Sequence, residues 1–78
     1  SIIKWSKRDI DDCVEYFELV DTSYMASLDT LYSGLTSKNK LFMILSHIGK
    51  TDLEIQQIFG VGPNAIRTLR SRIKAKLS

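Results

Sequence analysis

The stretch that decides the fold is TDLEIQQIFGVGPNAIRTLRSRIKAKL at residues 51–77, which predicts a short helix, a tight turn and a longer basic helix. Thr51 and Glu54 have the T-x-x-E spacing of a capping box, in which the two residues satisfy each other's backbone N–H groups. Gly60 stands where a helix end favours a left-handed residue, and Pro63 suits the first position of the next helix. The two helices are therefore expected to be joined by a turn of only a few residues.

The helix expected after Pro63 has two different faces on a wheel of about 3.6 residues per turn. One face is apolar and consists of Ile66, Leu69, Ile73 and Leu77. The opposite face has short uncharged side chains with cations on both sides: Asn64, Thr68, Ser71 and Ala75 in the middle, Arg67, Arg70 and Lys74 on one side, and Arg72 and Lys76 on the other. Short side chains can approach the base edges in a DNA major groove while the flanking cations meet the two phosphate walls. The pattern favours binding of duplex DNA; the alternative is a basic face that contacts only solvent.

Three further helices are expected upstream, each with a start signal, an end signal and an apolar face. They are expected at residues 6–20, 21–34 and 36–49, with starts at Ser6 (paired with Asp9), at Asp21 or Thr22, and at Thr36 or Ser37. Their inward faces are Ile10, Cys13, Val14, Phe17 and Val20; Tyr24, Met25, Leu28, Leu31, Tyr32 and Leu35; and Leu41, Ile44, Leu45 and Ile48. The sequence thus predicts an all-α fold of about five short helices, in which a tri-helical helix-turn-helix core follows two N-terminal helices.

The net charge of +2 conceals two oppositely charged halves. Residues 1–36 hold three cations and seven acids, and residues 37–78 hold eight cations and two acids, so their balances are −4 and +6. Such asymmetry indicates one half that faces a polyanion and another that is turned elsewhere. No run is long enough to span a membrane, no signal peptide is present, and a single cysteine excludes an internal disulfide. We therefore expect a cytoplasmic protein without membrane contact, and a start at serine rather than methionine suggests a fragment of a longer protein.

The chain has no pattern of catalytic or metal-binding residues. The acids of residues 6–20 lie opposite the apolar face without a histidine or glycine loop to complete a site, so they are expected to be solvated. His47 lacks a second candidate ligand, and Cys13 lies in an apolar stripe, which favours a surface residue and a buried structural thiol. There is no nucleophile–base pair and no phosphate-binding loop. The sequence predicts no enzyme, no catalytic residue, no metal site and no cofactor.

Four short motifs occur in register along the second half of the chain: LT (residues 35–36), EI (residues 54–55), V-x-x-x-x-I (residues 61–66) and R-I-x-x-K-L (residues 72–77). Together they resemble the LuxR-type helix-turn-helix, the DNA-binding domain of response regulators and quorum-sensing activators. The segment ahead of them is similar to the one that leads into this domain in large transcriptional regulators of Bacteroidetes. The resemblance implies an acidic helical lead-in at residues 1–34 and a LuxR-type DNA-binding domain at residues 35–78.

The resemblance also implies that the last helix, about residues 63–77, enters the DNA major groove in bacterial transcription regulation. The residues at the family's base-reading positions are Arg67, Thr68 and Ser71. Those at its phosphate-contacting positions are Lys50, Thr51, Gly62, Asn64, Arg70 and Lys74. The implied partner is double-stranded DNA. The implied assembly is a homodimer formed partly through regions outside this chain, with the two last helices in successive major grooves.

Three positions depart from the family pattern. Gln56 stands where the family has alanine at the close approach of the two motif helices, so these helices separate slightly or the glutamine lies sideways. Gly62 replaces a serine or threonine cap, which leaves only its backbone N–H for a phosphate. The chain stops at Ser78, where the family adds a fourth helix that supports dimerisation; either the N-terminal helices replace that support or the fragment lacks it. Leu53 falls on an outer face, where it could contact those helices or a second subunit.

Other interpretations of the same residues remain open. The segment FGVGPNAI resembles a helix-hairpin-helix that binds DNA without reading its sequence, although that motif requires a small residue where Ile66 stands. The polymerase-contacting end of a sigma factor shares the helix-turn-helix pattern. A third alternative is a protein-interaction or dimerisation module with a degenerate helix-turn-helix, which the departures at Gln56 and Gly62 favour.

Overall fold

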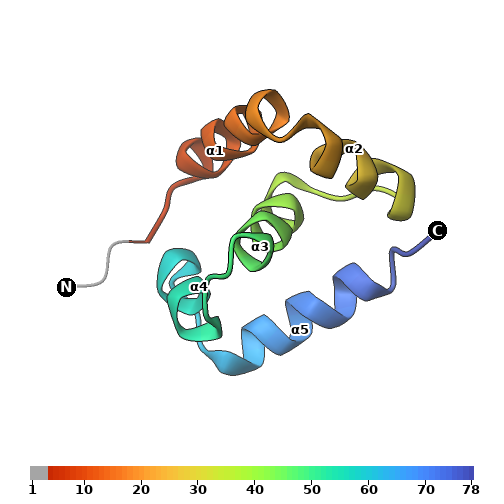
Figure 1. The fold of residues 1–78 in the computed structure, drawn as a ribbon. Helices are drawn as coiled ribbons and strands as arrows, with labels where there is room; N and C mark the ends of the chain where they lie inside the picture. Colours follow the sequence, from red (N-terminus) through yellow and green to blue (C-terminus); the bar gives the residue numbers. More distant parts are fainter. Residues whose placement is uncertain (1–3) are drawn as a thin grey trace.

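The computed structural model describes residues 4–78, which form five helices, and the expected all-α fold is confirmed. The helices are α1 (Lys7–Val20), α2 (Thr22–Leu31), α3 (Ser37–His47), α4 (Asp52–Phe59) and α5 (Pro63–Lys74). In Figure 1, α3 lies in the middle of the molecule, with α1 and α2 on one side and α4 and α5 on the other. The basic helix α5 is thus held on the far side of α3 from the acidic helix α1.

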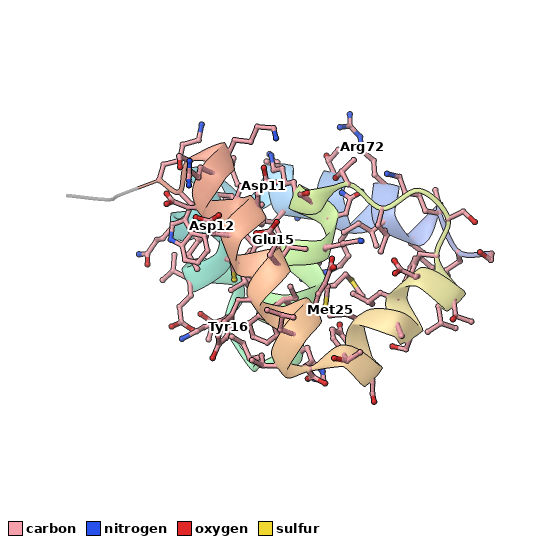
Figure 2. The ribbon with its side chains drawn as sticks, turned by 90° about the horizontal axis from the view of Figure 1, so that it is seen from above. Asp11, Asp12, Glu15, Tyr16, Met25 and Arg72 are labelled. Atoms are coloured by element: carbon pink, nitrogen blue, oxygen red, sulfur yellow. The ribbon has the colours of Figure 1, made fainter. Side chains whose placement is uncertain are left out.

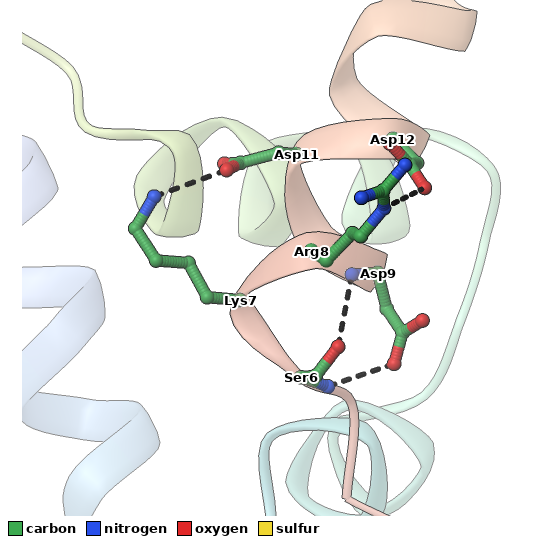
Figure 3. A network of polar contacts seen from close by, with 6 residues as sticks. All are labelled: Ser6, Lys7, Arg8, Asp9, Asp11 and Asp12. Atoms are coloured by element: carbon green, nitrogen blue, oxygen red, sulfur yellow. Dashed lines mark hydrogen bonds and ion pairs between the residues drawn. The ribbon is translucent and has the colours of Figure 1, made fainter.

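Capping boxes start three of the five helices. At α1 the Ser6 hydroxyl accepts the Asp9 N–H at 3.1 Å, and the Asp9 carboxylate accepts the Ser6 N–H at 2.8 Å (Figure 3). At α4 the expected pair also forms, because Thr51 and Glu54 exchange the same two bonds. The capping residues expected at these two starts are confirmed. A third box, at the start of α3, uses the neutral Asn39 and was not expected.

The core draws on all five helices. Its buried apolar side chains are Val14, Met25, Leu28, Leu41, Phe42, Ile44, Leu45, Ile55, Phe59, Ile66 and Ile73. The central helix α3 supplies four of them, of which Leu41, Ile44 and Leu45 were expected on its inward face and Phe42 was not. Val14 of α1 and Ile73 of α5 belong to the same cluster, so residues on both sides of the expected boundary at 34/35 share one core.

Four residues of the expected inward faces lie instead at the surface: Val20, Leu31, Ile48 and Leu77. Each lies at or beyond the end of its helix, where the chain no longer follows the helical wheel. The second helix ends at Leu31 rather than at Gly34, and Tyr32 is already extended. Likewise α5 ends at Lys74, three residues short of the expected end at 77. A periodic pattern predicted which face is buried, but tertiary contacts decided where each helix stops.

The residues after α5 return to the connection between α2 and α3. Tyr32 and Leu77 form an isolated antiparallel bridge, flanked by the bonds Ser33 N–H to Lys76 O at 2.8 Å and Ser78 N–H to Leu31 O at 2.9 Å. The Lys76 ammonium also donates to the Asn39 side chain at 2.8 Å. The C-terminal end of α5 is therefore fixed against the start of α3.

The segment before α1 lies against α4. The sequence does not decide whether the chain starts as part of a longer helix or folds back onto the core. The backbone N–H of Trp5 donates to the carbonyl of Ile58 at 3.0 Å, and the Trp5 side chain packs against the core. Lys4 and Trp5 therefore fold back, whereas residues 1–3 lie outside the described part of the chain.

Candidate nucleic-acid interface

The helix-turn-helix is formed by α4, a turn at residues 60–62 and α5. Gly60 ends α4 at a φ of 66°, the left-handed conformation that the sequence predicted. Pro63 occupies the first turn of α5. Gly62 is the N-cap residue before it; its backbone is extended, and as a glycine it has no side chain to cap the helix. On the inner side of α5, Ile66 and Ile73 are almost fully buried. These two anchors fix which face of the helix points outward.

The outward face of α5 is the one that the sequence assigned to DNA. We call its short side chains the α5 ridge: Asn64, Thr68, Ser71 and Ala75, all of them exposed. Thr68 and Ser71, two of the three expected base-reading residues, lie in this ridge, and the third, Arg67, is exposed at its border. The Arg67 guanidinium approaches the Asn64 side-chain oxygen at 3.4 Å. The structure thus brings the three expected base-reading residues onto one open surface.

Three cations of α5 are exposed without an acidic partner. Within residues 4–78, no ion pair involves Arg67, Arg72 or Lys74. Figure 2 shows Arg72 at the edge of the molecule, well away from Asp12 and Glu15 of α1. Arg67 and Lys74 lie on one side of the ridge and Arg72 on the other. A groove-binding helix needs cations on both sides, because it lies between two phosphate walls.

Arg70 and Lys76 are held by contacts within the protein. Arg70 donates to the Asp52 carboxylate at 2.8 Å, and its guanidinium lies 5.4 Å from the ring centroid of Phe42. Lys76 donates to the Gly34 carbonyl and to Asn39. These two residues lie where the charged face meets the core. Arg70 connects α5 to the start of α4, and Lys76 connects the end of the chain to the start of α3. Arg70 was expected to contact phosphate, and in this arrangement it shares its charge with Asp52.

The connection between α3 and α4 carries two further expected phosphate contacts. The Lys50 ammonium lies 3.9 Å from the Glu54 carboxylate and is partly exposed. The Thr51 N–H donates to Glu54 and its hydroxyl accepts the Glu54 N–H, so both groups serve the cap of α4. Because Asp52 reaches Arg70, this connection lies beside the middle of α5. Lys50 is therefore the group there with the most freedom to meet an anion.

The two substituted positions, Gln56 and Gly62, lie at the surface near this turn. Gln56 is half-buried and lines a hollow together with Lys4, Leu53 and the turn residues that follow α4. Leu53 is 62% exposed, in agreement with the outer face expected for it. Gly62 is exposed at the start of α5, and apart from its chain neighbours no described residue lies within 4 Å of the point that a Cβ atom would occupy there. The start of α5 is open to a ligand.

The remaining polar residues make structural contacts. The His47 ring stacks on Tyr24, with centroids 3.7 Å apart, and its Nε2 lies 3.3 Å from the Asp21 carboxylate. Burial raises the pKa of the Cys13 thiol, which keeps it protonated and unreactive near neutral pH. Among residues 4–78 there is no group of three or more His, Cys, Asp or Glu side chains that could hold a metal ion. The acids of α1 instead pair with neighbouring cations, as Lys7–Asp11 and Arg8–Asp12 show (Figure 3).

Acidic groups at the helix starts are held in their charged form. The backbone N–H of Ser6 lowers the pKa of Asp9, and the backbone N–H of Thr51 lowers the pKa of Glu54. The Lys7 ammonium lowers the pKa of Asp11. These shifts follow from hydrogen bonds to the ionised carboxylate. They belong to the caps and helix pairs, and none of them concerns the α5 ridge.

Sequence reasoning missed one cation beside α5. Lys38 of α3 lines a hollow with Leu69, Arg72 and Ala75, so it lies next to the Arg72 side of the ridge. The sequence contained one indication of this role. A lysine in the first turn of a helix is unfavourable, because it lies next to the positive end of the helix dipole. A residue that opposes a local preference often serves another purpose.

Comparisons with protein-family models, with curated proteins and with solved structures found no match to this chain. The LuxR-type resemblance therefore depends on the quoted motifs alone. None of the helices in residues 4–78 is both long enough and apolar enough to cross a membrane.

Proposed function

We propose that this chain binds double-stranded DNA with a sequence preference and places α5 in the major groove, as part of a bacterial transcription regulator of LuxR type. The observation that carries the proposal is the α5 ridge, which is exposed and has on both sides cations that lack an acidic partner within residues 4–78. The short side chains of the ridge would let the helix backbone approach the base edges. Arg67 is suited to the guanine edge, where a bidentate arginine contact is the commonest specific one.

The charge distribution supports a polyanionic partner. From Gly62 to the end of the chain there is no acidic residue, whereas five cations occur there. Helix α1 lies across α3 from α5 (Figure 1), so most of its acids are far from a duplex lying along α5. In the assembly we propose, two copies are joined through regions outside this chain, and their α5 helices occupy grooves about one helical turn apart.

A protein-interaction module is the second candidate, and one observation favours it. Tyr16, Leu19 and Val20 of α1 are exposed apolar side chains close together in sequence, and Leu19 is 82% exposed. Such a patch is typical of a surface that another protein covers. This function would use α1 and would leave α5 without a partner.

The test is a selection of bound sequences from random duplexes with the purified chain at low salt and high protein concentration. Binding to the selected duplex is then measured by fluorescence anisotropy across a salt series. We expect an enriched sequence and an affinity that falls steeply with salt, because each phosphate contact contributes about 0.9 to the slope of log K against log salt. A helix-hairpin-helix would bind without enrichment, and an interaction module would not bind.

A pair of serine variants assigns the binding to α5. Ser71→Glu puts a negative charge in the middle of the ridge and is expected to abolish binding to every duplex. Ser23→Glu puts the same charge on an exposed position of α2 and is expected to bind as the wild type does. Equal binding by both variants would exclude α5 as the DNA-contacting helix.

A further inference from the structure

Two hollows adjoin each other on the Arg72 side of α5. The first, of about 480 Å³, lies between the start of α1, the start of α3 and the end of α4, and three lysines line it: Lys4, Lys7 and Lys38. The second, of about 470 Å³, lies between the start of α3 and α5, and its cations are Lys38, Arg72 and Lys76. Thr36 and Lys38 line both hollows, so the surface is continuous across the start of α3.

This surface is strongly positive. Five cations line the two hollows against a single acid, Asp11. Lys76 is engaged by Asn39 and Gly34, and we call the other four cations the basic belt: Lys4, Lys7, Lys38 and Arg72. Among them Lys7 also pairs with Asp11 at 3.0 Å, so it would exchange this carboxylate for a phosphate on binding. The start of α3 adds a partial positive charge from its helix dipole. A continuous surface of this kind fits a chain of phosphates better than a single small anion.

Two of the belt lysines occupy positions that their own helices disfavour. Lys7 is the first residue of α1 and Lys38 the second residue of α3, both at the positive end of a helix dipole. The Lys38 ammonium lies 5.5 Å from the Phe59 ring centroid, a cation–π contact that offsets part of this cost. Both side chains therefore add positive charge where positive charge is already concentrated.

The belt begins at the α5 ridge itself. Ala75 of the ridge and Arg72 beside it line the second hollow together with Lys38. A duplex with α5 in its major groove would have one phosphate wall at Arg72, and the belt would follow that wall away from the groove. The acids Glu15 and Glu18 line a third hollow, which shares Lys7, Asp11 and Ser37 with the first, so negative charge adjoins the belt on that side.

We propose that the basic belt contacts the phosphates of the DNA strand on the Arg72 side of the groove, so that the N-terminal helix α1 takes part in DNA binding. This inference depends on the proposed function. It adds Lys4, Lys7 and Lys38 to the footprint, which are outside the helix-turn-helix. The contact is made to phosphates, so it strengthens binding to all sequences alike.

The test compares Lys7→Gln with Arg8→Gln in anisotropy titrations between about 50 and 200 mM salt on a duplex of about two helical turns. These neighbours form a matched pair, because each is about nine-tenths exposed and each pairs with an aspartate four residues later. Lys7→Gln and Lys38→Gln are each expected to lower the steepness of the salt dependence by about 0.9, so that over this salt range the affinity of the variant falls roughly threefold less than that of the wild type. Arg8→Gln is expected to leave the slope unchanged.

Asp11→Asn is expected to change the affinity for duplex DNA in the opposite direction. It removes the only acid of the two hollows and is expected to strengthen binding to all duplexes, which a folding defect would not do. If Ser71→Glu abolishes binding while Lys7→Gln and Lys38→Gln keep the wild-type slope, the belt is excluded and the proposed function stands. If the wild-type chain does not bind duplex DNA, the proposed function fails and the belt fails with it.

Discussion

Helices α1 and α5 both have one buried face and one charged face, yet their cations are placed differently. In α1, Lys7 pairs with Asp11 at 3.0 Å and Arg8 approaches Asp12 at 3.8 Å, so the helix neutralises much of its own charge (Figure 3). In α5 there is no acid, and Arg67, Arg72 and Lys74 lie exposed without an acidic partner among residues 4–78. Lys7 and Arg8 would therefore have to give up an aspartate to meet a phosphate, whereas these three cations of α5 have no acidic partner to give up. The difference shows that availability of charge, rather than its amount, distinguishes a candidate interface.

The largest expected effect comes from a substitution that weakens the contact between α5 and the core. Ile73 is 3% exposed, and Ile73→Ala is expected to lower the free energy of unfolding by about 2–5 kcal/mol, because it removes buried atoms and leaves a cavity. Urea unfolding followed by circular dichroism measures the change. Leu77→Ala is the control, since Leu77 is half exposed and should change stability by no more than about 0.5 kcal/mol. Equal effects would mean that the C-terminal bridge, and not the core, holds α5.

The second prediction separates base reading from phosphate contact on α5. Arg67→Ala is expected to reduce discrimination at one base pair by about 1–3 kcal/mol, because a bidentate contact to guanine would be lost. Lys74→Ala is expected to weaken binding to all sequences alike. A competition assay on single-base variants of the selected duplex distinguishes them. If Lys74→Ala lost the base preference and Arg67→Ala kept it, Lys74 would be the base-reading residue and Arg67 the phosphate contact.

The third prediction concerns the helix that lies between α1 and α5. Thr36→Ala removes the hydroxyl that accepts the Asn39 N–H at 3.1 Å, and it is expected to cost about 1 kcal/mol of unfolding free energy. Thermal unfolding provides the measurement. Thr30→Ala, an exposed threonine within α2, is the control and should change stability little. A neutral result for Thr36→Ala would show that tertiary packing alone sets the start of α3.

The fourth prediction concerns Arg70, the cation of α5 that pairs with Asp52. Asp52→Asn removes the partner of Arg70, an exposed pair that contributes about 0.2–1 kcal/mol to stability. Arg70 could then contact a phosphate fully, so the salt slope is expected to steepen by about 0.9. Asp29→Asn, in the lysine-paired surface of α2 and α3, is the matched control and should leave the slope unchanged. A shallower slope in Asp52→Asn would show that the ion pair orients Arg70 for the DNA.

The smallest expected effect is a pH dependence of the helix starts. Hydrogen bonds lower the pKa of Asp9 and of Glu54, so each folded-state pKa lies below the unfolded value of about 4. The stability they contribute is present above that value and is lost as pH falls through the lowered pKa values. Protection against amide hydrogen exchange, relative to the intrinsic rate at each pH, is therefore expected to fall below about pH 4 at the starts of α1 and α4. The start of α3 should not respond, because its cap uses the neutral Asn39.

Much of the candidate interface could be predicted because α5 obeys the helical wheel over its whole length. Ile66 and Ile73 mark the buried side, and the residues opposite them are necessarily exposed. The roles of Arg70 and Lys76 could not be predicted, because their partners lie 18 and 37 residues earlier in the chain. The position of Lys38 could not be predicted either, because only the packing of α3 places it beside Arg72.

Local sequence alone determined the five helices, the caps of α1 and α4, the left-handed Gly60 and the charged character of the α5 ridge. These features depend on hydrogen bonds and periodicities that span a few residues. Only the tertiary structure decided where α2 and α5 end, which cations are paired, and that the starts of α1 and α3 meet beside α5. Those outcomes depend on contacts between residues distant in sequence, whose geometry exists only once the core around α3 has formed.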